Sequence, residues 1–331
     1  MADTCRGTNR VKEYVPDYYS DFACLADKCR HSCCKGWEID VDEDSLKYYA
    51  SLPENWREKI VSNIEVDETG AHFCLTEEER CAFLQKNGLC ELILELGEDA
   101  LCQICADHPR FRNFFPDRTE TGLGLCCEAV GRLILGRKEK MKLLAITEDG
   151  AVDASVPEKD PVLELRAELI AVMQDRSMPV RERVEKLASA AGVNTIQQNE
   201  QYYKFLLRLE RLEEEWMQLL EALLTAVPFC DAPAETELTE TAFEQFMVYL
   251  LFRHLPDAEC PEEAGGQVLF CLFALSLVQK LCALKEMQAG TLQIEDVVEI
   301  CRLFSSEIEY SDENTDLIIE KLTGEINLWK R

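Results

Sequence analysis

Cysteines dominate residues 24–37, where four thiols fall within eleven positions. They are Cys24, Cys29, Cys33 and Cys34, and few aliphatic residues accompany them. Thiolates are the soft ligands that zinc, iron and iron–sulfur clusters select, whereas a packed core has no use for so many in so polar a segment. The stretch therefore indicates a metal-binding protein whose metal lies close to its function.

A second group of thiols follows in the next ninety residues. Its members are Cys74, Cys81, Cys90, Cys102, Cys105, Cys126 and Cys127. A tetrahedral zinc ion or a cubane cluster takes four ligands, so the two groups together hold too many thiols for one centre. Either there are two centres, or one centre has spare cysteines packed around it. We do not expect the adjacent Cys33 and Cys34 to bind the same ion.

The spacing of these cysteines leaves the kind of metal open. Zinc ribbons need two CxxC pairs, and only Cys102 and Cys105 form one. The run Cys24-x4-Cys29-x3-Cys33 is not that of a ferredoxin. It is not the radical S-adenosylmethionine motif CxxxCxxC either, because Gly36 stands where the third cysteine belongs. Zinc and an iron–sulfur cluster both remain possible readings.

Composition narrows the class of partner. The formal net charge is −28, from 35 basic and 63 acidic residues. Phosphate binding needs a basic surface, so we expect no nucleic acid partner.

The longest apolar run, residues 268–278, is too short to cross a bilayer and predicts a buried helix, so we expect no membrane association. No secretory signal pattern opens the sequence. We therefore expect a cytoplasmic protein whose reduced thiols favour metal sites over disulfides.

Periodicity predicts a mainly α protein in two domains. Twelve of the 17 cysteines lie in the first 127 residues, and the late five are scattered in apolar helical patterns. We expect residues 1–147 to form a cysteine-rich, metal-binding domain with short strands. An acidic connection then leads into an all-α helical bundle at residues 148–331, where apolar residues recur at three- and four-residue spacing.

Local signals predict the elements that carry the thiols. Residues 1–22 are expected to be irregular, and residues 111–125 are expected to be irregular chain with extended pieces. A strand should follow residue 37, and then a helix opened by the acidic turn Asp42-Glu43-Asp44. A hairpin should lie around Gly70, and residues 81–84 should form a strand. Cys90 should open one helix, and a second should carry Cys102 and Cys105 on one face before His108 ends it. Residues 202–227 are predicted to be one helix.

The order of several motifs resembles one known family. The blocks are YxPDYYxDFxC, then Cys-x4-Cys-x3-Cys-Cys-x-Gly-Trp, CAFL, GLC, LCxxCxxHPR, and a cysteine, Cys126, before Glu128. Over residues 14–135 this sequence is similar to the flagellin lysine-N-methylase family. The resemblance implies an iron–sulfur protein, with a 4Fe-4S cluster as the expected form, that transfers methyl from S-adenosylmethionine to lysine amines of flagellin.

The resemblance also implies a set of metal ligands. Carried over to this sequence, they are Cys24, Cys29, Cys33, Cys34, Cys81, Cys90, Cys102, Cys105 and Cys126. Cys74 is a further candidate ligand, Cys127 stands where relatives often have proline and is left out, and Cys5 precedes the matched region. No glycine-rich nucleotide loop follows a strand, so neither the donor site nor a catalytic residue is predicted.

Several residues near the thiols have more than one reading. Trp37 could stack on the adenine of the methyl donor or simply fill the core, and Arg110 or Arg112 could pair with its carboxylate or serve structure alone. His108 could be a base or a helix-ending residue. Besides a methyltransferase, the pattern permits a non-catalytic zinc or iron–sulfur interaction module, or a redox or metal-delivery protein.

Overall fold

The structure of this protein is a computed structural model. It describes residues 12–37, 39–68, 70–146, 152–153, 160–196, 198–226, 232–258 and 260–329. The chain forms two compact units. We call residues 23–110 with 127–129 the cysteine-rich unit, and residues 12–22, 111–126 and those from 130 on the helical unit. The predicted boundary between residues 147 and 148 lies outside the described residues, so that division stays a prediction.

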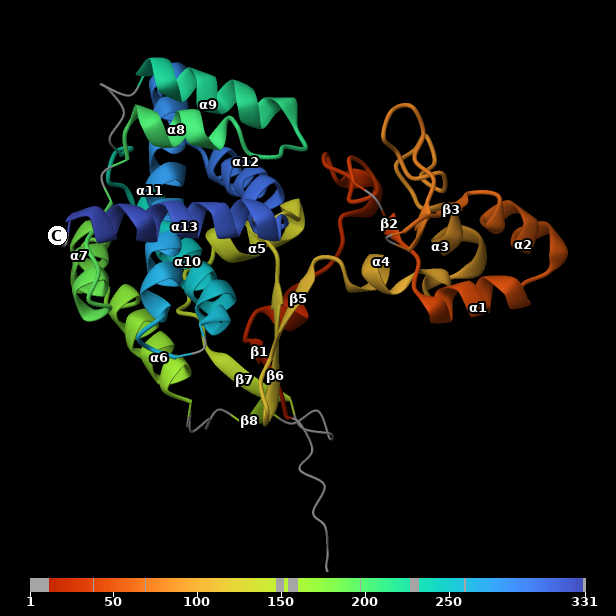
Figure 1. Ribbon diagram of the computed structural model, residues 1–331, viewed down its shortest axis with the longest axis horizontal. Coiled ribbons are helices and arrows are strands. Elements are labelled where there is room, and N and C mark those ends of the chain that lie inside the picture. Colours follow the sequence, from red (N-terminus) through yellow and green to blue (C-terminus); the bar gives the residue numbers. More distant parts are fainter. Residues whose placement is uncertain are drawn as a thin grey trace, which may run out of the picture. The chain divides into compact units, whose positions relative to one another are not determined.

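Two apolar helices form the centre of the helical unit. They are α10 (Glu237–His254) and α11 (Ala264–Ala289), which lie against one another (Figure 1). The helices packed around them are α5 (Glu128–Leu135), α6 (Pro161–Met173), α7 (Val180–Ala190), α8 (Glu200–Leu206), α9 (Glu214–Ala226), α12 (Ile294–Phe304) and α13 (Asp312–Trp329). In length and composition α11 could cross a membrane, but 78% of its apolar window is buried inside the structure, as in a core helix. The predicted buried helix at residues 268–278 is confirmed.

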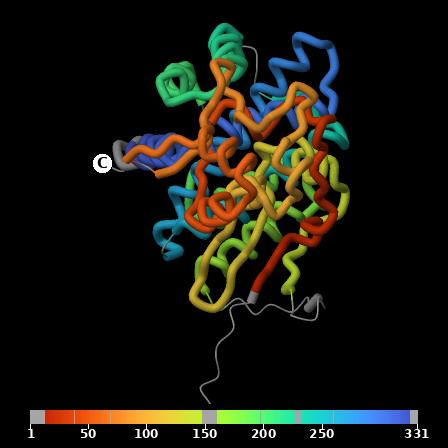
Figure 2. Tube along the Cα trace, turned by 90° about the vertical axis from the view of Figure 1, so that its right-hand side faces the viewer, coloured from red at the N-terminus to blue at the C-terminus, as the bar shows by residue number. Residues whose placement is uncertain are grey.

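A five-stranded sheet belongs to the same unit. Its strands, in spatial order, are β5 (Arg110–Phe114), β6 (Arg118–Leu123), β1 (Lys12–Pro16), β7 (Leu143–Ile146) and β8 (Val152–Asp153). Strand β1 is parallel to β6 and antiparallel to β7, and the β5–β6 hairpin, drawn in yellow and orange, is visible in Figure 2. The predicted irregular chain at residues 1–22 is therefore wrong where β1 forms, and the extended pieces expected within residues 111–125 are present as β5 and β6. The pairing of β1 with β6 and β7 joins segments a hundred residues or more apart, which local patterns do not encode.

The predicted helix over residues 202–227 is broken into α8 and α9. The buried carboxylate of Glu307 accepts hydrogen bonds from the backbone N–H groups of Leu212 and Glu213, at 2.9 and 2.6 Å. N–H groups at the start of a helix such as α9 have no acceptor within the helix. A negatively charged carboxylate at this end also interacts favourably with the helix dipole. The break thus depends on a residue almost a hundred positions downstream.

The cysteine-rich unit consists of short elements around its own small core. Its helices are α1 (Glu43–Ser51), α2 (Glu54–Val61), α3 (Glu91–Leu96) and α4 (Gln103–Asp107), and its sheet has the order β2 (Ile39–Asp40), β4 (Ala71–Phe73), β3 (Ile64–Val66). The predicted hairpin around Gly70 and the helix opened at Asp42 are confirmed. The predicted strand at residues 81–84 is wrong, because only isolated bridges form there. Helices make up 57% of the structure, so the mainly α class is confirmed.

Candidate metal centre

Five of the nine predicted ligands share one core in the cysteine-rich unit. Cys81 and Cys102 are buried in it, and Cys34, Cys90 and Cys105 pack against it. Aromatic side chains surround them, with Phe73 and Phe83 in an edge-to-face contact at 5.1 Å. We call Cys34, Cys81, Cys90, Cys102 and Cys105 the five-thiol group. They come from four separate segments, so the fold itself gathers them.

Backbone pairing places the first three members of this group. The N–H of Cys81 donates to the carbonyl of Cys34 at 2.9 Å. A turn then reverses the chain, with the N–H of Gln85 bonded to the carbonyl of Leu89 at 2.9 Å, and Cys90 follows as the residue that precedes α3. The prediction that Cys90 opens a helix is therefore confirmed.

The last two members lie at the start of α4. Cys102 precedes the helix and Cys105 lies within it, with their Sγ atoms 3.3 Å apart. The carboxylate of Asp42, which also caps α1, accepts the N–H of Gln103 at 2.8 Å. The hydroxyl of Tyr49 donates to the carbonyl of Ala100 at 2.8 Å, in a buried position. These two bonds fix the CxxC pair against α1.

Four thiols of this group resist ionisation in the protein alone, and Cys102 is the exception. Burial raises the pKa of Cys81 to about 12 and also raises the pKa of Cys90. The hydrogen bond with Cys102, followed by burial, raises the pKa of Cys105, and the same bond lowers the pKa of Cys102. A bound metal supplies the positive charge that this environment lacks, and a coordinated thiol loses its proton. Shielded sulfur donors of this kind fit a soft metal ion or a cluster.

The other four predicted ligands lie outside that core. Cys24 and Cys33 are exposed, although Cys33 shares a hydrogen bond with Cys34. Cys29 is half-buried and its thiol donates to the carbonyl of His31 at 3.0 Å. Cys126 belongs to the helical unit, where it hydrogen-bonds Tyr310.

Metal binding itself stays a prediction. Across the described ranges, no group of three or more histidine, cysteine, aspartate or glutamate side chains has the geometry to hold a metal ion. The five thiols are neighbours that are not in a coordinating arrangement. Cys5 and Cys230 lie outside the residues that the structure describes.

Trp37 and His108 border the thiols and contact each other. The indole N–H of Trp37 donates to the carbonyl of Cys33 at 2.8 Å, and its ring centroid lies 6.5 Å from that of His108. Burial, with a smaller effect of Arg110, lowers the pKa of His108 to about 4. His108 is therefore neutral near pH 7 and a weak base, and as predicted it ends α4. The guanidinium of Arg110 donates to the carbonyl of Ala106 at 3.3 Å.

A buried polar network in the helical unit has no counterpart in the sequence analysis. His254 Nε2 and Glu309 Oε1 lie 2.7 Å apart, and the hydroxyl of Tyr249 donates to Glu309 Oε2 at 3.0 Å. The guanidinium of Arg253 donates to that hydroxyl and lies over the ring of Tyr310 at 4.7 Å. Glu309 ends a π-helical turn, Ser305–Glu309, after α12. Only a π turn, which spacing does not reveal, aims this carboxylate at α10.

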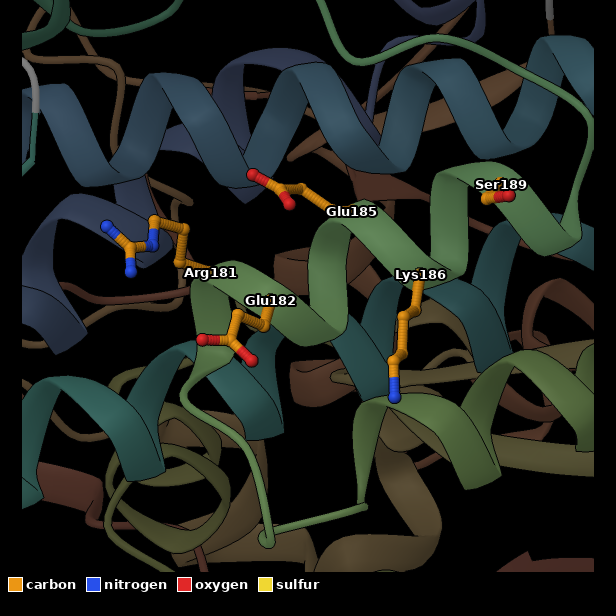
Figure 3. Close-up of a pocket in the computed structure, with 5 residues that line it drawn as sticks. All are labelled: Arg181, Glu182, Glu185, Lys186 and Ser189. Atoms are coloured by element: carbon orange, nitrogen blue, oxygen red, sulfur yellow. The ribbon is translucent and has the colours of Figure 1, made fainter.

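The surface of α7 carries an open depression of about 590 Å³. Figure 3 shows that its five side chains, Arg181, Glu182, Glu185, Lys186 and Ser189, all project from this one helix. Both charge signs are present, and the lining residues named above include no apolar side chain. A small-molecule site is concave and mostly apolar, so this depression does not qualify as one.

Taken together, the described residues define a helical protein with a thiol-rich unit of its own. Residues 194–329 match the family model of the FliB lysine N-methylase C-terminal domain. This match confirms the resemblance to the flagellin lysine-N-methylase family, and it lies in the helical unit, beyond the cysteine motifs that suggested it.

Curated relatives point in the same direction. The chain is 27% identical over 134 residues to the lysine-N-methylases of Salmonella typhimurium and Salmonella choleraesuis, which is 39% of this chain and 33% of each relative. It is 26% identical over 134 residues to the flagellar biosynthetic protein FliU of Salmonella muenchen, covering 79% of that protein. The chain thus spans about a third of the length of the two lysine-N-methylases. No solved structure matches it.

Proposed function

We propose that this protein transfers methyl groups from S-adenosylmethionine to lysine side-chain amines of flagellin. The observation that carries the proposal is the match of residues 194–329 to the FliB lysine N-methylase C-terminal domain. Relatives named lysine-N-methylase and flagellar biosynthetic protein support the lysine acceptor and the flagellar substrate.

The reaction places one demand on the acceptor. The amine nitrogen attacks the donor's methyl carbon, the carbon–sulfur bond breaks with its electron pair on sulfur, and the products are methyl-lysine, S-adenosylhomocysteine and a proton. Free lysine has a pKa near 10.4, so the enzyme must bind the amine in its neutral form. A net charge of −28 favours the approach of a lysine-bearing protein surface before that proton is lost.

We further propose that the transfer depends on a metal centre held by the five-thiol group, with an iron–sulfur cluster as the expected form and zinc as the alternative. Support comes from the donors themselves. Four segments converge on one core, its thiols are buried or half-buried, and burial raises the pKa of Cys81 and Cys90. Thiols with a raised pKa need a positive charge nearby to become thiolates.

A second candidate is a non-catalytic zinc or iron–sulfur module. The specific observation in its favour is that the five-thiol group lies in a compact unit of its own, apart from the matched residues 194–329. In that case metal would stabilise the cysteine-rich unit, and methyl transfer would be absent.

The test is incubation of the anaerobically purified chain with unmodified flagellin and S-adenosylmethionine, followed by mass spectrometry of flagellin peptides. Methyl groups on lysines, absent without the donor and absent without the protein, are the expected result. If metal-loaded protein leaves every lysine unmodified, the methyltransferase proposal is wrong and the module is favoured.

A further inference from the structure

Glu128 connects two parts of the cysteine-rich unit that lie a hundred residues apart. Its carboxylate is fully buried, with a side-chain exposure of 0%. One oxygen, Oε2, accepts the backbone N–H of Arg30 at 3.0 Å, and the other, Oε1, accepts Nε–H of the same arginine at 3.1 Å. A single buried carboxylate thus binds both the backbone and the side chain of one residue.

The neighbour of that residue is a predicted ligand. The Sγ of Cys29 lies 3.9 Å from Glu128 Oε2, and it donates to the carbonyl of His31 at 3.0 Å. Residues 29–31 belong to no helix or strand, so regular backbone pairing does not hold them in place. Charge-assisted hydrogen bonds are about twice as strong as neutral ones and become more so when buried. The Glu128 carboxylate is suited to restrain this loop.

We propose that Glu128 is a positioning residue that holds Cys29 in its place in the cysteine-rich unit. The inference rests on the proposed function only in its consequence, which is that a restrained Cys29 is ready to bind metal as a predicted ligand outside the five-thiol group. The position of the Cys29 thiol does not depend on bound metal, so it can also be tested in the metal-free protein.

Substitution Glu128→Gln keeps the volume but turns one acceptor into an NH2 group that faces the donors of Arg30. We expect the loop to open more often and Cys29 to react about tenfold faster with iodoacetamide, because one strong hydrogen bond amounts to about a tenfold shift in equilibrium. The half-buried Cys74 of the same unit serves as the internal reference. Peptide mass spectrometry gives the ratio of the two alkylation rates in metal-free, full-length protein.

Control variants separate positioning from general destabilisation. Glu120→Gln removes another fully buried carboxylate partner of an arginine, but in the helical unit, and should leave the Cys29 to Cys74 ratio unchanged. Arg30→Ala keeps the backbone N–H bond and should raise the ratio less than Glu128→Gln does.

Metal content provides the second measurement, by elemental and sulfide analysis of anaerobically purified protein. We expect Glu128→Gln to hold less metal than wild type, because Cys29 is a predicted ligand outside the five-thiol group, and the metal of the five-thiol group itself should remain. An unchanged alkylation ratio in Glu128→Gln overturns the proposal, whatever the metal content. A raised ratio in Glu128→Gln, together with a wild-type protein that binds no metal, would support the positioning role and contradict the metal centre alone.

Discussion

The Sγ atoms of Cys102 and Cys105 lie 3.3 Å apart across the first turn of α4. With zinc–sulfur bonds of about 2.3 Å, a tetrahedral ion holds two thiolates about 3.8 Å apart. A small side-chain movement would therefore let both bind one zinc ion, whereas a cluster would require them to separate further. Their partners Cys34, Cys81 and Cys90 share the same core.

Serine substitution within the five-thiol group should release metal. We expect Cys34→Ser and Cys105→Ser to lower metal per chain by more than half, because an alcohol is a poor ligand for a soft metal. Elemental and sulfide analysis after anaerobic purification measures this. The control is Cys282→Ser, since Cys282 is a fully buried thiol of α11 in the other unit. Full metal retention in both group variants would show that the ligand set is wrong.

A methyl group at Gly122 would overlap the ring of Phe111. That ring lies edge-on to Tyr249 at 6.2 Å and below the guanidinium of Arg253 at 4.9 Å, so it cannot move freely. We expect Gly122→Ala to lower the free energy of unfolding by about 1–3 kcal/mol in denaturant titration. Gly136→Ala is the matched control, because its new methyl would meet only ordinary contacts. Equal stability of the two variants would contradict the packing.

Glu120 and Arg166 form a bidentate ion pair at 2.6 and 2.9 Å with almost no exposure of either side chain. Substitution Arg166→Met leaves a buried carboxylate without this partner and should cost about 3–5 kcal/mol of unfolding free energy.

The double variant Glu120→Leu with Arg166→Met should recover most of that loss, because no charge then remains buried. Urea titrations of the wild type, the single variant and the double variant measure both effects. A single variant as stable as wild type would show that the pair contributes nothing.

The pH dependence of stability should report on His254. Burial alone lowers its pKa, but hydrogen bonds to Asp257 and Glu309 outweigh that effect and leave the pKa raised. A raised pKa stabilises the fold fully below the unfolded value of about 6.5, and the contribution is lost as pH rises through the folded pKa.

We therefore expect the unfolding free energy of wild type relative to His254→Asn to fall as pH increases above about 6.5. Denaturant titrations at a series of pH values give this difference directly. A difference that stays constant or grows with increasing pH would refute the assignment.

Elements that depend on neighbouring residues could be predicted from the sequence, whereas those that depend on contacts between distant segments could not. Asp42 as a helix cap, Cys90 before α3 and His108 after α4 follow from neighbouring residues, and the structure has all three. Strand β1 depends on β6 and β7, far along the chain, and the break before α9 depends on Glu307. The division of nine predicted ligands into five gathered thiols and four others depends likewise on tertiary packing.

Methyl transfer by wild type, Cys34→Ser and Cys282→Ser, assayed side by side on flagellin with S-adenosylmethionine, tests the central claim most directly. Peptide mass spectrometry should show methylated lysines with wild type and with Cys282→Ser, and a loss of at least tenfold in rate with Cys34→Ser. Equal methylation by all three proteins would contradict dependence on the five-thiol group. No methylation by metal-loaded wild type would contradict the proposed activity itself.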